Sequence, residues 1–161
     1  MDLYLAFTLK SKDISKRLIT DIFINLDKED IYKNRAWRGV WDTGATRSAI
    51  DKRIVDELNL TSVGKARLST ANGEKIVNTY RISMILPNEV TISNVLVSEV
   101  ELGEDCDLLV GMDIISKGDF SITNKYGETV FSFRTPSIKE IDYVKESKKE
   151  IEQFIALNYN K

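Results

Sequence analysis

The chain has 161 residues, a formal net charge of −2 and an ordinary apolar content, which suits one domain with a hydrophobic core and does not suit a polyanion-binding protein. It contains no histidine and one cysteine, Cys106, which argues against zinc sites, disulfide frameworks and histidine-dependent hydrolases and leaves acid–base chemistry to Asp, Glu, Lys or Tyr. No apolar run is long enough to span a bilayer and 1–4 lacks the features of a signal peptide, so we expect a cytoplasmic protein whose partners include neither membrane nor nucleic acid.

Apolar and β-branched runs predict short strands in the first part of the chain. These strands are expected over 3–9, 18–26 and 36–41. The charged stretch 27–35 is expected to be a hairpin loop. Apolar residues spaced along one face then predict a short helix over 52–58, with Ser48 or Asp51 as its N-terminal cap.

A β-hairpin is predicted in the middle of the chain, because Asn72-Gly73 is the pair best suited to a two-residue turn. Its strands are expected over 66–71 and 74–82, followed by strands over 82–86, 90–100 and 108–111. Helical turns are expected over 112–117. The acidic stretch 101–107 fits no EF-hand spacing, so a solvated loop is favoured over a calcium site.

A last hairpin and a C-terminal helix complete the predicted elements. The hairpin strands are expected over 120–122 and 129–133. Ser137 and Glu140 form a capping-box pair that predicts a helix starting at Pro136-Ser137, with a broken apolar stripe that either docks on its own domain or forms a dimer or partner interface. The expected division is a mainly β domain over 1–136 and a helical extension over 137–161.

One short motif, Trp41-Asp42-Thr43-Gly44-Ala45-Thr46, carries a chemical prediction. It places an acid at the end of an apolar strand, followed by residues that permit a tight turn. A plain β-turn is the simpler interpretation of Asp42-Thr43-Gly44 by itself. However, two facing carboxylates that share a proton can activate water, and because the motif occurs once, the second carboxylate would come from a second copy of the chain.

The chain resembles the retropepsins, homodimeric aspartic proteases of the retroviral and cellular retroviral-protease-like kind. The similarity rests on three segments in the right order: the active-site signature 40–45, the hairpin 66–80 in the place of the flap, and the apolar strand with its helix, 108–115. The resemblance implies a mainly β fold, described as a closed β-barrel half with short helices, and a homodimer acting on a polypeptide without metal or other cofactor. It also implies an aspartic endopeptidase; the alternative is a catalytically silent dimerisation or peptide-binding module.

The resemblance implies roles for individual residues. Asp42 would be catalytic, with Thr43 and Gly44 supporting the active-site loop. The substrate-binding residues would be Ala45, Thr46, Thr70, Ala71, Asn72 and Gly73. The last four belong to the predicted flap, and an inert hairpin is the alternative for them.

Two positions depart from the retroviral pattern and make the chain more similar to cellular and bacterial members. Many retroviral enzymes carry acids after Asp-Thr-Gly-Ala and an arginine after the later glycine. Here Thr46-Arg47 and Met112-Asp113 occupy those places. The family's ion pair between these segments is therefore either absent or inverted, and an inverted pair between Arg47 and Asp113 is a hypothesis. The sequence does not specify the substrate.

Overall fold

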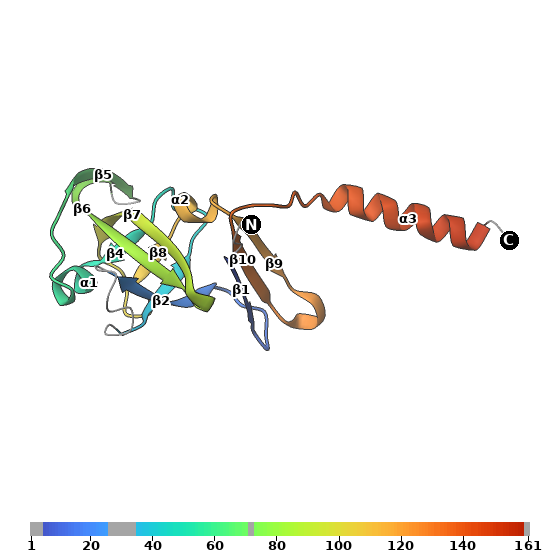
Figure 1. Ribbon diagram of the computed structural model, residues 1–161, viewed down its shortest axis with the longest axis horizontal. Helices are drawn as coiled ribbons and strands as arrows, with labels where there is room; N and C mark the ends of the chain where they lie inside the picture. Colours follow the sequence, from blue (N-terminus) through green and yellow to red (C-terminus); the bar gives the residue numbers. More distant parts are fainter. Residues whose placement is uncertain (1–4, 26–34, 71–72, 160–161) are drawn as a thin grey trace.

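The computed structural model describes residues 5–25, 35–70 and 73–159 and contains two β-sheets and a long C-terminal helix (Figure 1). The strands are β1 (Leu5–Lys10), β2 (Ile19–Asn25), β3 (Trp37–Trp41), β4 (Ala49–Asp51), β5 (Gly64–Thr70), β6 (Gly73–Leu86), β7 (Val90–Val100), β8 (Leu108–Val110), β9 (Asp119–Thr123) and β10 (Val130–Thr135). The helices are α1 (Lys52–Glu57), α2 (Met112–Ile115) and α3 (Tyr143–Tyr159), with short 3₁₀ turns η1 (Pro87–Glu89) and η2 (Lys125–Gly127).

The larger sheet holds seven strands in the order β2-β3-β8-β4-β7-β6-β5, and β2 also pairs with β6. The β3 and β8 strands run parallel at its centre, with Trp41 opposite Val110. By contrast, β5 lies at the end of the order and pairs only with β6. Strand β3 is therefore supported on both sides, whereas β5 is an edge strand.

The smaller sheet has the order β1-β10-β9 and contributes aromatic side chains to the core. Phe7, Phe131 and Phe133 pack around Trp41 of β3, with ring centroids 5.8, 5.1 and 5.1 Å from the Trp41 ring. All four side chains are buried. Aromatic rings bury large apolar areas, so this cluster joins the two sheets and fixes the end of β3.

Three local predictions differ from the structure, besides the expected strands 74–82 and 82–86, which form the single strand β6. Thr70 pairs with Gly73, so the hairpin turn is displaced by one residue and its connecting residues, Ala71 and Asn72, lie outside the described residues. Gly73 has a φ of 108°, which glycine adopts without strain. The three-residue strand β4 was not predicted, because so short a run has no visible periodicity. The predicted loop 27–35 lies almost entirely outside the described residues.

The third difference concerns the C-terminal helix, which begins at Tyr143 instead of at Pro136-Ser137. The Ser137 hydroxyl donates to Asp119 instead of capping a helix. Asp142 is the cap, because its carboxylate accepts from the backbone N–H groups of Val144 and Lys145 at 3.0 and 3.1 Å. The prediction of a capping box at Ser137 is therefore wrong.

Helix α3 projects away from the strands (Figure 1), and its residues from 143 to 158 are exposed. The apolar stripe of Val144, Ile151, Phe154 and Ile155 is 50–65% exposed, so α3 does not dock on its own domain. The prediction of a dimer or partner helix stays a prediction. Of the helices in the described ranges, none combines the length and apolarity that crossing a bilayer requires.

The mainly β class and the C-terminal helix are confirmed. The closed barrel stays a prediction. Trp37 and Trp41 belong to the core and are 0% and 5% exposed. Asp107 is buried and accepts from the backbone N–H of Arg38 at 2.9 Å, so the acidic stretch is only partly a solvated loop.

Candidate active site

Strand β3 carries the chain to Asp42 along a buried path. Gly39 in its centre leaves no room for a side chain, because a Cβ there would lie 2.4 Å from Ile22 Cδ1. The Trp41 indole donates to Thr20 Oγ1 at 3.0 Å, which satisfies its buried N–H. The Asp42 backbone N–H donates to the Val110 carbonyl at 2.9 Å. The acid thus leaves the sheet at a point that β2, β8 and the aromatic cluster fix.

Asp42 begins a tight turn that its own carboxylate stabilises. The Gly44 N–H donates to Asp42 Oδ1 at 2.8 Å, and the Ala45 N–H donates to the Asp42 carbonyl at 3.2 Å. A Cβ at Gly44 would lie 3.2 Å from Oδ1, so glycine allows the backbone N–H to approach the carboxylate. Asp42 is half-buried, and it does not itself line the cavity described below.

The turn rests on the start of α2, where Gly111 permits close packing. The Met112 N–H donates to the Ala45 carbonyl at 2.8 Å. A Cβ at Gly111 would lie 2.6 Å from the Arg47 carbonyl carbon and 2.9 Å from the Ala45 carbonyl oxygen. Both are backbone atoms, so the turn can occupy this position only because residue 111 is glycine.

A buried hydrogen-bond network closes the far end of the turn. Asp113 Oδ1 accepts from the Ser48 N–H at 2.9 Å and from the Ser48 hydroxyl at 2.8 Å. The Ser48 oxygen in turn accepts from the Gly111 N–H at 3.0 Å, and Ser48 is fully buried. Among the described residues, Arg47 forms no ion pair with Asp113. The sequence indicated Ser48 only as a possible helix cap. No local signal reveals the observed role, because the partner Asp113 is 65 residues away in sequence.

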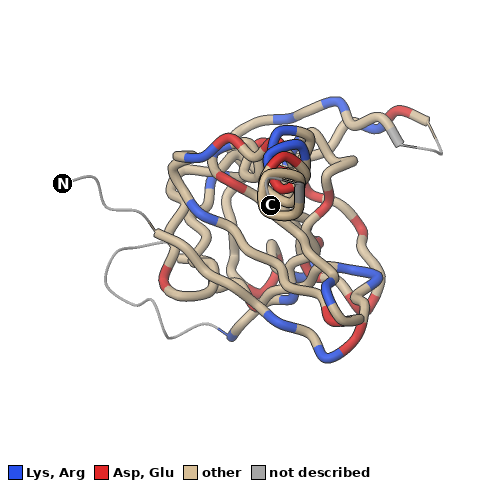
Figure 2. The backbone as a smooth tube through the Cα atoms, turned by 90° about the vertical axis from the view of Figure 1, so that its right-hand side faces the viewer, with Lys and Arg blue, Asp and Glu red and all other residues tan. Residues whose placement is uncertain are grey.

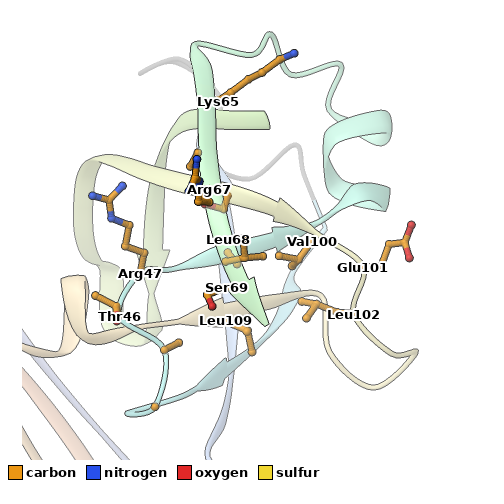
Figure 3. Close-up of a pocket in the computed structure, with 15 residues that line it drawn as sticks. Thr46, Arg47, Lys65, Arg67, Leu68, Ser69, Val100, Glu101, Leu102 and Leu109 are labelled. Atoms are coloured by element: carbon orange, nitrogen blue, oxygen red, sulfur yellow. The ribbon is translucent and has the colours of Figure 1, made fainter. Parts of the chain in front are cut away.

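A cavity of about 840 Å³ lies between this turn and strand β5 (Figure 3). The turn supplies one wall and β5 the opposite wall, and the end of β7 with the following loop supplies a third side. The lining residues are Gly44, Ala45, Thr46, Arg47, Ala49, Lys65, Ala66, Arg67, Leu68, Ser69, Ser98, Val100, Glu101, Leu102 and Leu109. A groove of this size can hold several residues of an extended peptide.

The structure brings some of the predicted site residues to this cavity. Gly44, Ala45 and Thr46 line it, and Asp42 lies at the base of the same turn. Thr43 is exposed, and in the described part of the chain its hydroxyl has no hydrogen-bond partner.

The predicted flap residues lie at the far end of the hairpin. The described lining of the cavity ends at Ser69, and Thr70 and Gly73 pair with each other beyond it. Ala71 and Asn72 lie outside the described residues. The stretch Lys65–Ser69 was not predicted as part of the site. Its role depends on facing the Asp42 turn across the cavity, and only the structure shows that arrangement.

Two polar groups strengthen the third side of the cavity. The pKa of Asp51 is lowered. Burial alone would raise it, but hydrogen bonds donated by the Arg53 side chain and by the backbone N–H groups of Arg53 and Leu102 stabilise the ionised carboxylate more strongly. The Leu102 N–H lies 2.6 Å from Asp51 Oδ2, which fixes Leu102 at the cavity edge. Burial, and a hydrogen bond to Glu99, raise the pKa of Tyr80 to about 12, so Tyr80 stays a neutral donor.

Within the described ranges, no group of three or more His, Cys, Asp or Glu side chains is placed to hold a metal ion. Cys106 is buried, and burial raises the pKa of its thiol. A thiol in that state is a poor nucleophile. The chemical groups that face the cavity are therefore the Asp42 turn and the charged side chains around it.

Comparisons with known proteins agree with this geometry. The family described as "gag-polyprotein putative aspartyl protease" matches residues 33–117. The crystal structure of a retropepsin-like aspartic protease from Rickettsia conorii is similar, with a TM-score of 0.52 and 18% identity over 83% of this chain and 96% of that chain. The solution structure of simian foamy virus (mac) protease is similar with a TM-score of 0.44 and 14% identity over 61% of this chain and 91% of that chain. No curated protein matches the chain.

Because the identity is only 18%, the likeness to the Rickettsia structure shows a shared fold and nothing further. The family match covers more than half of the chain and includes the Asp42 turn, the β5–β6 hairpin and strand β8. The chain therefore belongs to the gag-polyprotein aspartyl protease family and has a retropepsin-like fold.

Proposed function

We propose that the protein is an aspartic endopeptidase that acts as a homodimer, with Asp42 of each copy forming the catalytic pair. Its main support is the position of Asp42 at the first residue of the turn whose next residues wall the cavity. A peptide lying along that wall would place its backbone next to the carboxylate. The turn is mostly exposed and Asp42 is half-buried, so the turn is accessible to its counterpart across a two-fold axis.

The proposed reaction is hydrolysis of a peptide bond by an activated water molecule. Two carboxylates in close contact cannot both ionise, so the pair shares a proton, as in aspartic proteases generally. The ionised Asp42 removes a proton from a water molecule as the water oxygen attacks the carbonyl carbon. The protonated Asp42 donates to the carbonyl oxygen, and a proton then passes to the departing amine. Neither a covalent intermediate nor a metal ion takes part in this scheme.

The division of the chain belongs to the same proposal. Residues 1–136 would form the peptidase domain, and residues 137–161 a helical extension outside it. Support comes from α3, which is exposed along its described length, and from the two sheets, whose strands all precede residue 136. The Thr43 hydroxyl would hydrogen-bond across the two-fold, and Thr70, Ala71, Asn72 and Gly73 would close over the substrate.

Replacing Asp42 by Asn tests the catalytic role. The substitution removes the ionisable group with little change of shape, so we expect cleavage of an unfolded protein to fall by at least about 10²-fold. Cleavage should be measured over a pH series, with circular dichroism to confirm that Asp42→Asn is folded. Equal cleavage by both proteins would overturn the proposal, and no cleavage by folded, dimeric wild type would favour the silent module.

Dilution tests the homodimer. A site that exists only between two copies should lose specific activity as the protein is diluted below its dissociation constant. Activity per mole should therefore fall in parallel with the dimer fraction measured by analytical ultracentrifugation. Constant activity at concentrations where the protein is monomeric would contradict a shared site.

A further inference from the structure

We infer, on the basis of the proposed peptidase function, that Arg47 makes the enzyme selective for polypeptides that carry an acidic side chain close to the cleaved bond. The charges around the cavity, the position of Arg47 and the apolar floor each contribute to this assignment. The substrate class is an extended segment with apolar residues at its centre and a carboxylate beside them.

Arg47 combines a fixed backbone with an unengaged side chain. Its carbonyl group packs against Gly111, and the next N–H, from Ser48, is bonded to Asp113. Asp113 Oδ1 accepts from both donors of Ser48, and in the described part of the chain no ion pair joins Asp113 to Arg47. The Arg47 side chain is exposed, and in the ranges that the structure describes it has no ion-pair partner. Its charge is therefore available to a ligand.

The other charged side chains of the cavity leave an excess of positive charge. Lys65 and Arg67 line it together with Arg47, against a single acid, Glu101. Arg67 is partly neutralised by Glu74, 3.3 Å away, but both are well exposed. Figure 3 shows Glu101 on the opposite side of the cavity from Arg47.

This local excess stands out against the rest of the protein. The formal net charge is −2, and acidic and basic residues are interspersed along the tube in Figure 2. Long-range attraction by the whole molecule therefore does not favour acidic ligands. Selectivity would come from the short-range contact at Arg47, where a planar guanidinium can bind a carboxylate through two parallel hydrogen bonds.

The floor of the cavity supplies the second element of recognition. Val100 of β7 and Leu109 of β8 supply apolar side chains there, and Leu68 supplies another from the β5 wall (Figure 3). An extended peptide presents successive side chains to opposite faces, so it can place an apolar side chain on this floor while a neighbouring side chain reaches the rim. A segment with an apolar side chain next to an acidic one would bind the floor and Arg47 at the same time.

Binding to the catalytically silenced protein tests the inference without requiring cleavage. Two matched decapeptide pools would be used, apolar at the two central positions, with Glu at the flanking positions in one pool and Gln in the other. In the Asp42→Asn protein we expect the Glu pool to bind about fivefold more tightly than the Gln pool at low salt, the size of a partly screened charge contact. The preference should shrink at high salt.

The double variant Asp42→Asn, Arg47→Gln should bind the Glu pool and the Gln pool equally. The control is Asp42→Asn, Lys125→Gln, which removes an equal charge from η2, outside the cavity lining. Equal binding of both pools to Asp42→Asn, or an equal loss of preference in the Lys125 control, would overturn the inference.

Mapping of cleavage sites separates this inference from the proposed function. With wild-type Asp42, sites cut in an unfolded protein should be enriched in Asp and Glu near the cleaved bond, and Arg47→Gln should abolish the enrichment. Cleavage that depends on Asp42 but shows no enrichment would refute the role of Arg47 alone. Acid-selective binding without cleavage would refute the peptidase and retain the role of Arg47.

Discussion

The two main walls of the cavity are built in different ways. The Asp42 turn is held by backbone hydrogen bonds to Val110 and Met112 and by the buried Ser48 network. The opposite wall, β5, is an edge strand that pairs only with β6, and its residues from 64 to 69 are exposed or half-buried. One wall is fixed by the core, and the other is attached through a single hairpin.

This difference matches the tasks that the two walls would have. Acid–base chemistry requires a carboxylate held in position, because small displacements of reacting groups are costly in rate. A wall that admits and releases a polypeptide must instead open, and segments with few buried contacts open at the lowest free-energy cost. The substitutions below test whether the contrast holds in solution.

Gly111→Ala should have the largest effect on stability, because it disturbs the packing of the wall that the core holds in place. The added Cβ would lie 2.6 Å from the Arg47 carbonyl carbon, so the backbone of the turn must move. We expect a loss of about 2–3 kcal/mol in the free energy of unfolding, together with reduced activity. Urea denaturation and peptide cleavage measure the two effects.

Gly103→Ala is the matched control for this substitution, because nothing lies within 4 Å of a Cβ at that position. It should leave both stability and cleavage close to those of the wild type. If Gly111→Ala also behaved like wild type, the turn would not be packed against α2 in solution.

Ser48→Ala should have a smaller effect than Gly111→Ala on the same wall. It removes the acceptor of the buried Gly111 N–H and one of the two donors to Asp113. Leaving a buried group unpaired costs about 1–3 kcal/mol, and we expect a loss of about 1–2 kcal/mol in urea denaturation. In the described part of the chain, the exposed hydroxyl of Ser116 bonds only to the Met112 carbonyl, so Ser116→Ala should change stability by less than about 0.5 kcal/mol.

Asp51→Asn should change how stability depends on pH. The folded-state pKa of Asp51 is lowered, so its ionised form stabilises the fold above the unfolded-state pKa of about 4, and this contribution is lost as the pH falls through the folded-state pKa. The variant should be less stable than wild type at neutral pH, and the gap should narrow below about pH 4. A gap that is constant from neutral to strongly acidic pH would contradict the ionic role of Asp51.

The sequence was sufficient for the features that depend on local pattern. The residues around Asp42 predicted the turn, and alternating apolar residues predicted most of the strands. Asp51 was correctly considered as the cap of α1, where its carboxylate accepts from the Arg53 N–H at 2.9 Å. These features involve neighbours in sequence, so composition and spacing are enough to indicate them.

The features that sequence reasoning missed depend on contacts between distant residues. The expected Arg47–Asp113 pair is replaced by Ser48, because the backbone turn brings a buried hydroxyl closer to Asp113 than an exposed guanidinium. The helix predicted at Ser137 is displaced because Asp119, eighteen residues earlier, binds the Ser137 hydroxyl. Local capping signals cannot reveal that a distant carboxylate competes for the same side chain.

The smallest effect on stability is expected at the exposed end of strand β6. The same substitution, Ile to Thr, is compared there and at a buried position of the same strand. Ile76 is 72% exposed, so Ile76→Thr should change the free energy of unfolding by less than about 0.5 kcal/mol. Ile82 is 3% exposed, and Ile82→Thr should cost at least about 2 kcal/mol, because it buries a hydroxyl and removes packing. Both values come from urea denaturation at a protein concentration where the chain is monomeric. If Ile76→Thr proved as costly as Ile82→Thr, the exposed end of the hairpin would be packed against another part of the chain, and β5 could not serve as the wall that opens.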